Sequence, residues 1–169
     1  MATKRRLDTR KPQPHRIAFL SGAILALLIL SVPTWAQDDQ GHIKYRQHLM
    51  GSIGASTGAV GDILKYRLSL LPNVEAHAKN IANDAKLISS AFREQVIAGA
   101  TDAKANIWTE WEDFEKAIQK MESAAKQLEE AGDDADLGKV AAGMKSLGRS
   151  CSGCHKQFRK PKEESYKRK

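Results

Sequence analysis

Apolar residues recur every three or four positions along nearly the whole chain from residue 37 onward, and this spacing predicts amphipathic helices. We expect four helices, at about residues 39–68, 73–92, 106–131 and 134–160. The segment 93–105 is the least regular and is either a loop or a helical extension. Four such helices with short or moderate connections predict an all-α fold, an antiparallel four-helix bundle.

Local signals mark several ends of these helices. Asn73 follows Pro72 and has the side chain of an N-cap for the second helix. Gly132 is a natural stop for the third helix, and Pro161 ends the last because proline cannot continue a helix. Three of the four predicted helices therefore have a boundary signal in the sequence.

Residues 1–36 have the composition of a cleaved secretory signal peptide. Six bases precede an apolar run over residues 17–32, and Pro33-Thr34-Trp35-Ala36 gives a small-residue cleavage pattern. The alternative is an uncleaved anchor, but the run is shorter than the roughly 20 apolar residues of a spanning helix. We expect cleavage after Ala36, export to the periplasm, and one domain over residues 37–169 with no stable membrane anchor.

Removing the signal peptide changes the charge balance. The whole chain carries a formal net charge of +7, but residues 1–36 hold six of the 27 bases and one of the 20 acids, so residues 37–169 keep a net +2. A near-neutral domain lacks the strong positive charge typical of nucleic-acid binding, so we expect no nucleic-acid partner. The remaining bases concentrate in a tail from about residue 160, which would be solvated or would steer an acidic partner.

The residues Cys151-Ser152-Gly153-Cys154-His155 form the C-x-x-C-H pattern that attaches a c-type haem. Cys151 and Cys154 can each form a thioether with a haem vinyl group, and His155 can supply the proximal nitrogen to iron. The three side chains share the apolar face of the last predicted helix. The sequence therefore predicts one covalently attached haem c inside the bundle.

A redox disulfide and a zinc site are the alternatives for this pair of cysteines. Redox C-x-x-C pairs usually accompany a βαβ pattern, and nothing in the sequence predicts a strand. Structural zinc needs further ligands at regular spacing, whereas the chain has two cysteines and scattered histidines. Haem attachment is the interpretation that the sequence favours.

Glycine recurs at positions 51, 54, 58 and 61 of the first predicted helix, although each costs roughly 1 kcal/mol relative to alanine. The four positions fall within about a quarter of the helix circumference, and Met50 adjoins them. A strip without side chains can bring a second helix close or receive a flat cofactor, and both interpretations stay open.

Met50 is the candidate for the iron ligand opposite His155. A thioether is a soft ligand, and a His/Met pair raises the reduction potential, which suits electron transfer. Met121 and Met144 also lie on predicted core faces, so the apolar pattern alone does not single out Met50.

These features resemble the class II cytochromes c, the cytochrome c′ family, over nearly all of residues 37–169. The resemblance rests on Tyr45-Arg46-Gln47, Ile107-Trp108, Phe114, and the C-x-x-C-H motif followed by Phe158-Arg159. It implies that Met50, four residues after Arg46, lies over the open haem face, as in the low-spin subgroup in which methionine is the sixth ligand. It also implies that Arg46 contacts a haem propionate and that Arg159 lies near the proximal histidine. The alternative for both arginines is a solvated surface charge.

The sequence and the resemblance together predict a periplasmic mono-haem one-electron carrier with low-spin haem ligated by His155 and Met50. The alternative is a five-coordinate cytochrome c′-type protein that binds or scavenges nitric oxide or carbon monoxide. No catalytic acid, base or nucleophile constellation points to an enzyme, and the lack of a distal acid–base residue argues against a haem peroxidase. We expect transient redox partner proteins, and the resemblance is compatible with a homodimer through the first two helices.

Overall fold

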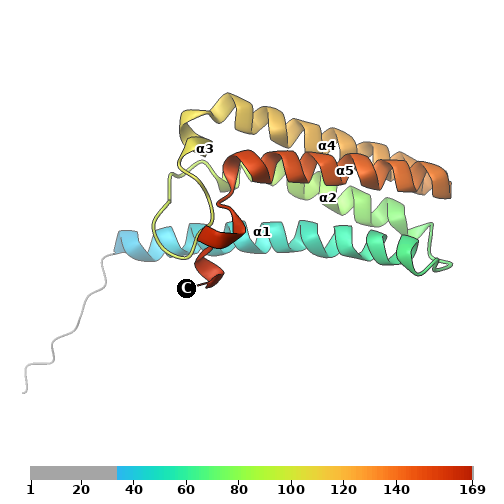
Figure 1. Ribbon diagram of the computed structural model, residues 1–169, viewed down its shortest axis with the longest axis horizontal. Helices are drawn as coiled ribbons and strands as arrows, with labels where there is room; N and C mark the ends of the chain where they lie inside the picture. Colours follow the sequence, from blue (N-terminus) through green and yellow to red (C-terminus); the bar gives the residue numbers. More distant parts are fainter. Residues whose placement is uncertain (1–33, 169) are drawn as a thin grey trace, which may run out of the picture. The chain divides into compact units, whose positions relative to one another are not determined.

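The computed structural model describes residues 34–168, which form five α-helices, two short 3-10 helices and no named strand (Figure 1). The helices are α1 (Thr34–Lys65), α2 (Asn73–Ala91), α3 (Asn106–Thr109), α4 (Trp111–Asp133) and α5 (Leu137–Phe158). The four long helices run up and down in chain order, which confirms the predicted all-α four-helix bundle. The predicted signal peptide, apart from residues 34–36 at the start of α1, lies outside the described residues.

The helices pack in an order that matters for the site. The contact between α2 and α4 is the most extensive, α1 packs mainly against α2, and α5 packs mainly against α4. Only sparse contact joins α1 directly to α5. The core is apolar, and its largest fully buried side chains are Ile81, Ile107, Leu128, Leu147, Val60, Val74 and Val140.

A glycine allows the close approach of α4 to α2. A Cβ atom built on Gly132 would lie 2.9 Å from the Cα of Glu75 and would also collide with the backbone nitrogen of that residue. No side chain fits at that distance, so position 132 needs glycine for packing. The sequence suggested a helix stop there, but Gly132 lies inside α4, which ends at Asp133.

The predicted third helix is in fact two helices. Glu110 adopts a non-helical conformation between α3 and α4, with φ −119° and ψ 42°. Its carboxylate accepts hydrogen bonds from the side chains of Asn106 at 3.2 Å and Gln157 at 3.0 Å. The break is thus held by a contact with the end of α5, which no local sequence pattern reveals.

The second helix begins at the predicted residue, but the predicted cap is wrong. Asn73 is the first helical residue of α2, and Pro72 before it is already in the α conformation. The last helix begins at Leu137 rather than near residue 134, because Asp136 is its N-cap and accepts a hydrogen bond from the Lys139 N–H at 2.9 Å.

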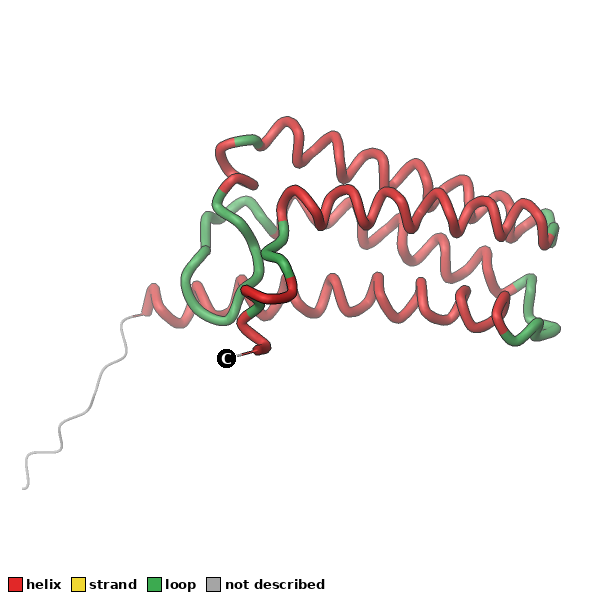
Figure 2. The backbone as a smooth tube through the Cα atoms, viewed as in Figure 1, coloured by secondary structure: helices red, strands yellow, loops and turns green. Residues whose placement is uncertain are grey.

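The loop after α2 and the C-terminal tail lie at the end of the bundle where α5 ends. Residues 93–105, left open between loop and helix, form a long loop, and the C-terminal 3-10 helices lie at the same end (Figure 2). Among the described helices, none combines the length and hydropathy needed to cross a membrane.

Candidate haem site

The two cysteines lie near the end of α5, and both are free thiols. Each is half-buried and packs against the core. Burial raises the pKa of Cys151, and burial together with the neighbouring Cys151 raises the pKa of Cys154 to about 11. Both thiols are therefore neutral near pH 7, side by side on one helix face.

The imidazole of His155 follows directly on the same helix, and its side chain is exposed. The protein around the ring removes enough water to lower its pKa, and the positive charge of Arg159 lowers it further. This favours the neutral imidazole, which is the form that binds iron. The backbone N–H of Arg159 donates to the His155 carbonyl at 3.1 Å and closes the last turn of α5, while a haem contact of Arg159 stays a prediction.

An aromatic cluster fixes the end of α5 that carries these residues. Phe158, three residues after His155, packs edge-on against Phe114 of α4 at a centroid distance of 5.1 Å. Phe114 in turn contacts Phe92 at 5.3 Å and Trp111 at 5.6 Å. Aromatic pairs in this distance range add to stability beyond their buried area. The cluster gives the cysteines and the histidine a rigid base.

The glycine strip of α1 faces open space. A Cβ atom added at Gly51, Gly54, Gly58 or Gly61 would meet no atom within 4 Å in the described part of the chain. Close packing against another helix of the described chain is therefore not its explanation. Met50 beside it is half-buried and contacts the core. A surface of this kind suits a flat group against α1.

Arg46, predicted to contact a propionate, is buried with a relative exposure of 4%. Its guanidinium donates to three backbone carbonyls at and after the end of α2: Nε to Ala91 and Nη1 to Val96, both at 2.9 Å, and Nη2 to Glu94. Burial lowers the pKa of Arg46, and the nearby Asp39 and Glu94 charges oppose that shift. The alternative of a solvated surface charge is wrong for this residue.

The guanidinium also lies over two aromatic rings, 4.7 Å from the centroid of Phe92 and 5.4 Å from that of Trp108. Trp108 donates its own indole N–H to the Phe92 carbonyl at 2.8 Å. Three of the five N–H donors of Arg46 are used by carbonyls, which leaves donors for an anionic group. Its contact with a haem propionate stays a prediction.

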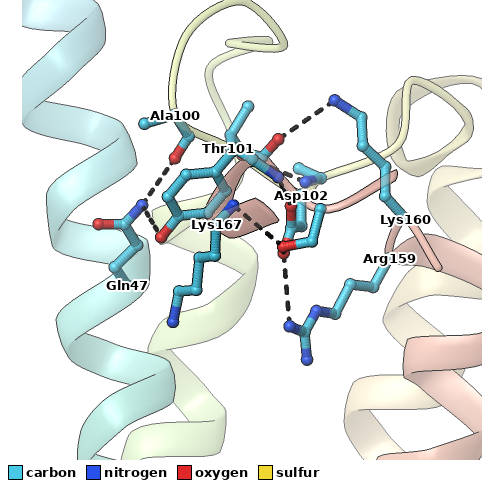
Figure 3. A network of polar contacts seen from close by, with 10 residues as sticks. Gln47, Ala100, Thr101, Asp102, Arg159, Lys160 and Lys167 are labelled. Atoms are coloured by element: carbon cyan, nitrogen blue, oxygen red, sulfur yellow. Dashed lines mark hydrogen bonds and ion pairs between the residues drawn. The ribbon is translucent and has the colours of Figure 1, made fainter. Parts of the chain in front are cut away.

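Sequence reasoning missed one part of this region. Asp102, in the loop after α2, pairs with Arg159 at 3.4 Å and also binds the C-terminal tail (Figure 3). The basic charge of the tail was compatible with a tail that is simply solvated. That interpretation is wrong, because the tail is docked on the protein. The residues involved are more than 50 positions apart, so no local pattern reveals them.

The zinc alternative finds no ligands. Within residues 34–168, no group of three or more His, Cys, Asp or Glu side chains is arranged to hold a metal ion. The free thiols, the neutral imidazole and the open strip of α1 do fit a covalently attached haem.

Comparison with known proteins decides the family. Residues 41–159 match the family model described as Cytochrome C′. The chain belongs to the cytochrome c′ family. A cytochrome c′ of Rhodospirillum rubrum is 33% identical over 138 residues, which cover 81% of this chain and 94% of the relative. A cytochrome c-556 of Agrobacterium tumefaciens (strain II Chrys) is 31% identical over 120 residues, which cover 70% of this chain and 97% of the relative.

Solved structures agree with this assignment. A nitric oxide complex of a variant cytochrome c prime from Alcaligenes xylosoxidans superposes with a TM-score of 0.67 at 26% identity, covering 73% of this chain and 97% of that one. Members of the cytochrome c′ family bind one covalently attached haem c per chain. In this chain Cys151 and Cys154 would hold the haem, with His155 as the proximal iron ligand.

The comparisons contradict the predicted main function, a one-electron carrier with low-spin haem ligated by His155 and Met50. The Rhodospirillum relative is a cytochrome c′, and the Alcaligenes structure is a nitric oxide complex. A gas ligand needs an axial position that a permanent second protein ligand would occupy. These findings favour the alternative, a cytochrome c′ that binds gas molecules.

Proposed function

We propose that this cytochrome c′ binds nitric oxide or carbon monoxide, and that it does so in the periplasm after removal of residues 1–36. The observation that carries the proposal is the open glycine strip beside Met50 on α1, the helix whose direct contact with the haem-bearing α5 is sparse. The bound haem supplies the iron that takes up the gas. The solved nitric oxide complex of a neighbour in the same family supports this choice.

Each residue of the site has a defined task in this proposal. Cys151 and Cys154 fix the haem to α5, and His155 in its neutral form binds iron from that side. Met50 lies on the side of the site that α1 forms. Its half-buried thioether limits the space for a gas molecule there. Ligation of iron by Met50, which the resemblance implies, stays a prediction that the same experiment tests.

We further propose that the protein acts by binding and not as an enzyme. Carbon monoxide binds haem iron only in the reduced, ferrous state. A transient protein that donates an electron to the haem therefore remains an expected partner. Exposed bases at the end of α5 and in the tail, among them Lys156, Lys162 and Lys167, favour an acidic donor. A homodimer and the absence of nucleic acid or a membrane anchor also stay predictions.

The test compares three reduced holoproteins: wild type, Met50→Ala and Met144→Ala. Met144 is a half-buried methionine on α5 and controls for loss of a core thioether. Wild type should bind carbon monoxide, Met50→Ala should bind it faster, and Met144→Ala should match wild type. With the same three proteins oxidised, loss of a methionine-to-iron absorption band in Met50→Ala alone would establish ligation. If wild type takes up neither gas, the proposed function is wrong.

A further inference from the structure

Asp102 anchors the C-terminal tail by several hydrogen bonds. Its side chain is 9% exposed. Oδ1 accepts the backbone N–H of Tyr166 at 3.0 Å, and Oδ2 accepts the hydroxyl of the buried Ser165 at 2.9 Å and pairs with Arg159 at 3.4 Å. One carboxylate thus binds both the residue that follows α5 and the 3-10 turn at the end of the tail.

The backbone around Asp102 adds a second set of contacts. Lys160 donates its N–H to the Asp102 carbonyl at 2.8 Å and its ammonium to the Thr101 carbonyl at 3.2 Å. Ala103 and Arg159 form an antiparallel bridge. The chain therefore leaves α5 along a fixed path beside the loop.

The far end of the tail reaches α1. The side-chain amide of Gln47 donates to the Tyr166 hydroxyl at 3.0 Å and to the Ala100 carbonyl at 2.7 Å (Figure 3). The tail, the loop and α1 meet at this amide. Residues 160–168, which we call the strap, thus connect the end of α5 to α1.

The two attachment points lie next to the haem site. Gln47 is one helical turn before Met50 on α1, and Arg159 is one turn after His155 at the end of α5. The helices α1 and α5 have little direct contact. A link between them therefore helps to set the distance between the two helices. The family match ends at residue 159, so the strap lies beyond the matched region.

We propose that Asp102 is a positioning residue that holds the strap across α5 and α1 and thereby fixes the position of α1 beside the haem. It acts through Arg159, Tyr166 and Gln47 and touches neither the haem nor the gas. With the strap released, the turns of α1 around Gln47 gain freedom and a gas ligand enters faster. This inference rests on the proposed gas-binding function.

The experiment uses the holoproteins of wild type, Asp102→Asn, a chain lacking residues 162–169, and the control Asp133→Asn. Asp133 is an exposed acid at the opposite end of α4 from Trp111. Asp133→Asn therefore removes the same charge as Asp102→Asn without touching the strap. Stopped-flow mixing measures the carbon monoxide association rate, and hydrogen exchange reports on residues 43–50 of α1. The truncated chain keeps the test valid if Asp102→Asn disturbs the loop itself.

We expect Asp102→Asn and the truncation each to raise the association rate by about threefold or more and to speed exchange over residues 43–50, with Asp133→Asn unchanged. Faster exchange in the strap, with no change in the rate or in residues 43–50, would overturn the proposal. If wild type binds no carbon monoxide, the proposed function fails, and exchange over residues 43–50 alone then decides the role of the strap.

Discussion

Arg46 of α1 donates a hydrogen bond through Nη1 to the carbonyl oxygen of Val96, 2.9 Å away and 50 residues further along the chain. This bond is one of three that attach the loop after α2 to α1 through a buried cation. Hydrogen bonds from charged groups are stronger than neutral ones, and an unpaired carbonyl in this position is costly. Arg46 therefore organises the loop that also carries Asp102.

We expect Arg46→Lys to lower the free energy of unfolding by about 2–4 kcal/mol, because an ammonium cannot reproduce the forked contact with three carbonyls. Denaturant unfolding of the holoprotein measures the change. Arg67→Lys, at an exposed turn after α1, is the control and should stay within about 0.5 kcal/mol of wild type. Equal stability of the two variants would show that the carbonyl contacts do not hold the loop.

Gly132 and Gly54 distinguish two uses of glycine in this fold. Alanine at position 132 would collide with the backbone of Glu75, so Gly132→Ala should lose about 1–3 kcal/mol in urea unfolding. Alanine at position 54 meets open space and has the better helix propensity, by up to about 1 kcal/mol. In the haem-free protein, Gly54→Ala should therefore unfold no earlier than wild type, and a loss as large as that of Gly132→Ala would mean that the strip packs against protein.

Cys151 and Cys154 should each form one thioether bond. Cys154→Ala should therefore keep its haem through a single bond, with the absorption band of its pyridine haemochrome at longer wavelength because one vinyl group stays unsaturated. Replacing both cysteines should release the haem on denaturation, which mass spectrometry detects. A Cys154→Ala protein with the wild-type haemochrome spectrum would contradict this assignment.

The Asp102 carboxylate gives a prediction about pH. Burial by itself raises its pKa, but hydrogen bonds from Tyr166, Ser165 and Arg159 outweigh that effect and keep the pKa below the ordinary 3.8. A group with a lower pKa in the folded than in the unfolded state stabilises fully above its unfolded pKa, and that stabilisation is lost as the pH falls through the folded pKa.

The strap should accordingly stay docked at neutral pH and loosen only below about pH 4. Carbon-13 NMR of the Asp102 carboxyl group measures the midpoint directly in the holoprotein. A midpoint for Asp102 above the ordinary 3.8 would show that the hydrogen bonds do not bind the charged form.

The sequence predicted the fold well where short-range patterns decide it. Apolar spacing located all four long helices, because each helix buries one stripe of side chains against the same core. The C-x-x-C-H motif predicted a covalently attached haem c, the cofactor that members of the family bind, because the chemistry requires those residues at that spacing. The predicted membership of the chain in the cytochrome c′ family was confirmed by the match over residues 41–159.

Features held by distant contacts were not predictable in this way. The break at Glu110 depends on Gln157, and the docking of the tail depends on Asp102, a residue with no distinguishing neighbours in the sequence. The predicted carrier function failed for a related reason. A methionine at position 50 marks one side of the site, but its residue type does not determine whether the iron position stays available to a gas.

The most direct test of the central claim is an optical titration of the reduced, haem-loaded wild-type protein with carbon monoxide. The account predicts a shift of the main haem absorption band that saturates at one molecule of carbon monoxide per chain. A spectrum that stays unchanged at saturating carbon monoxide would contradict it.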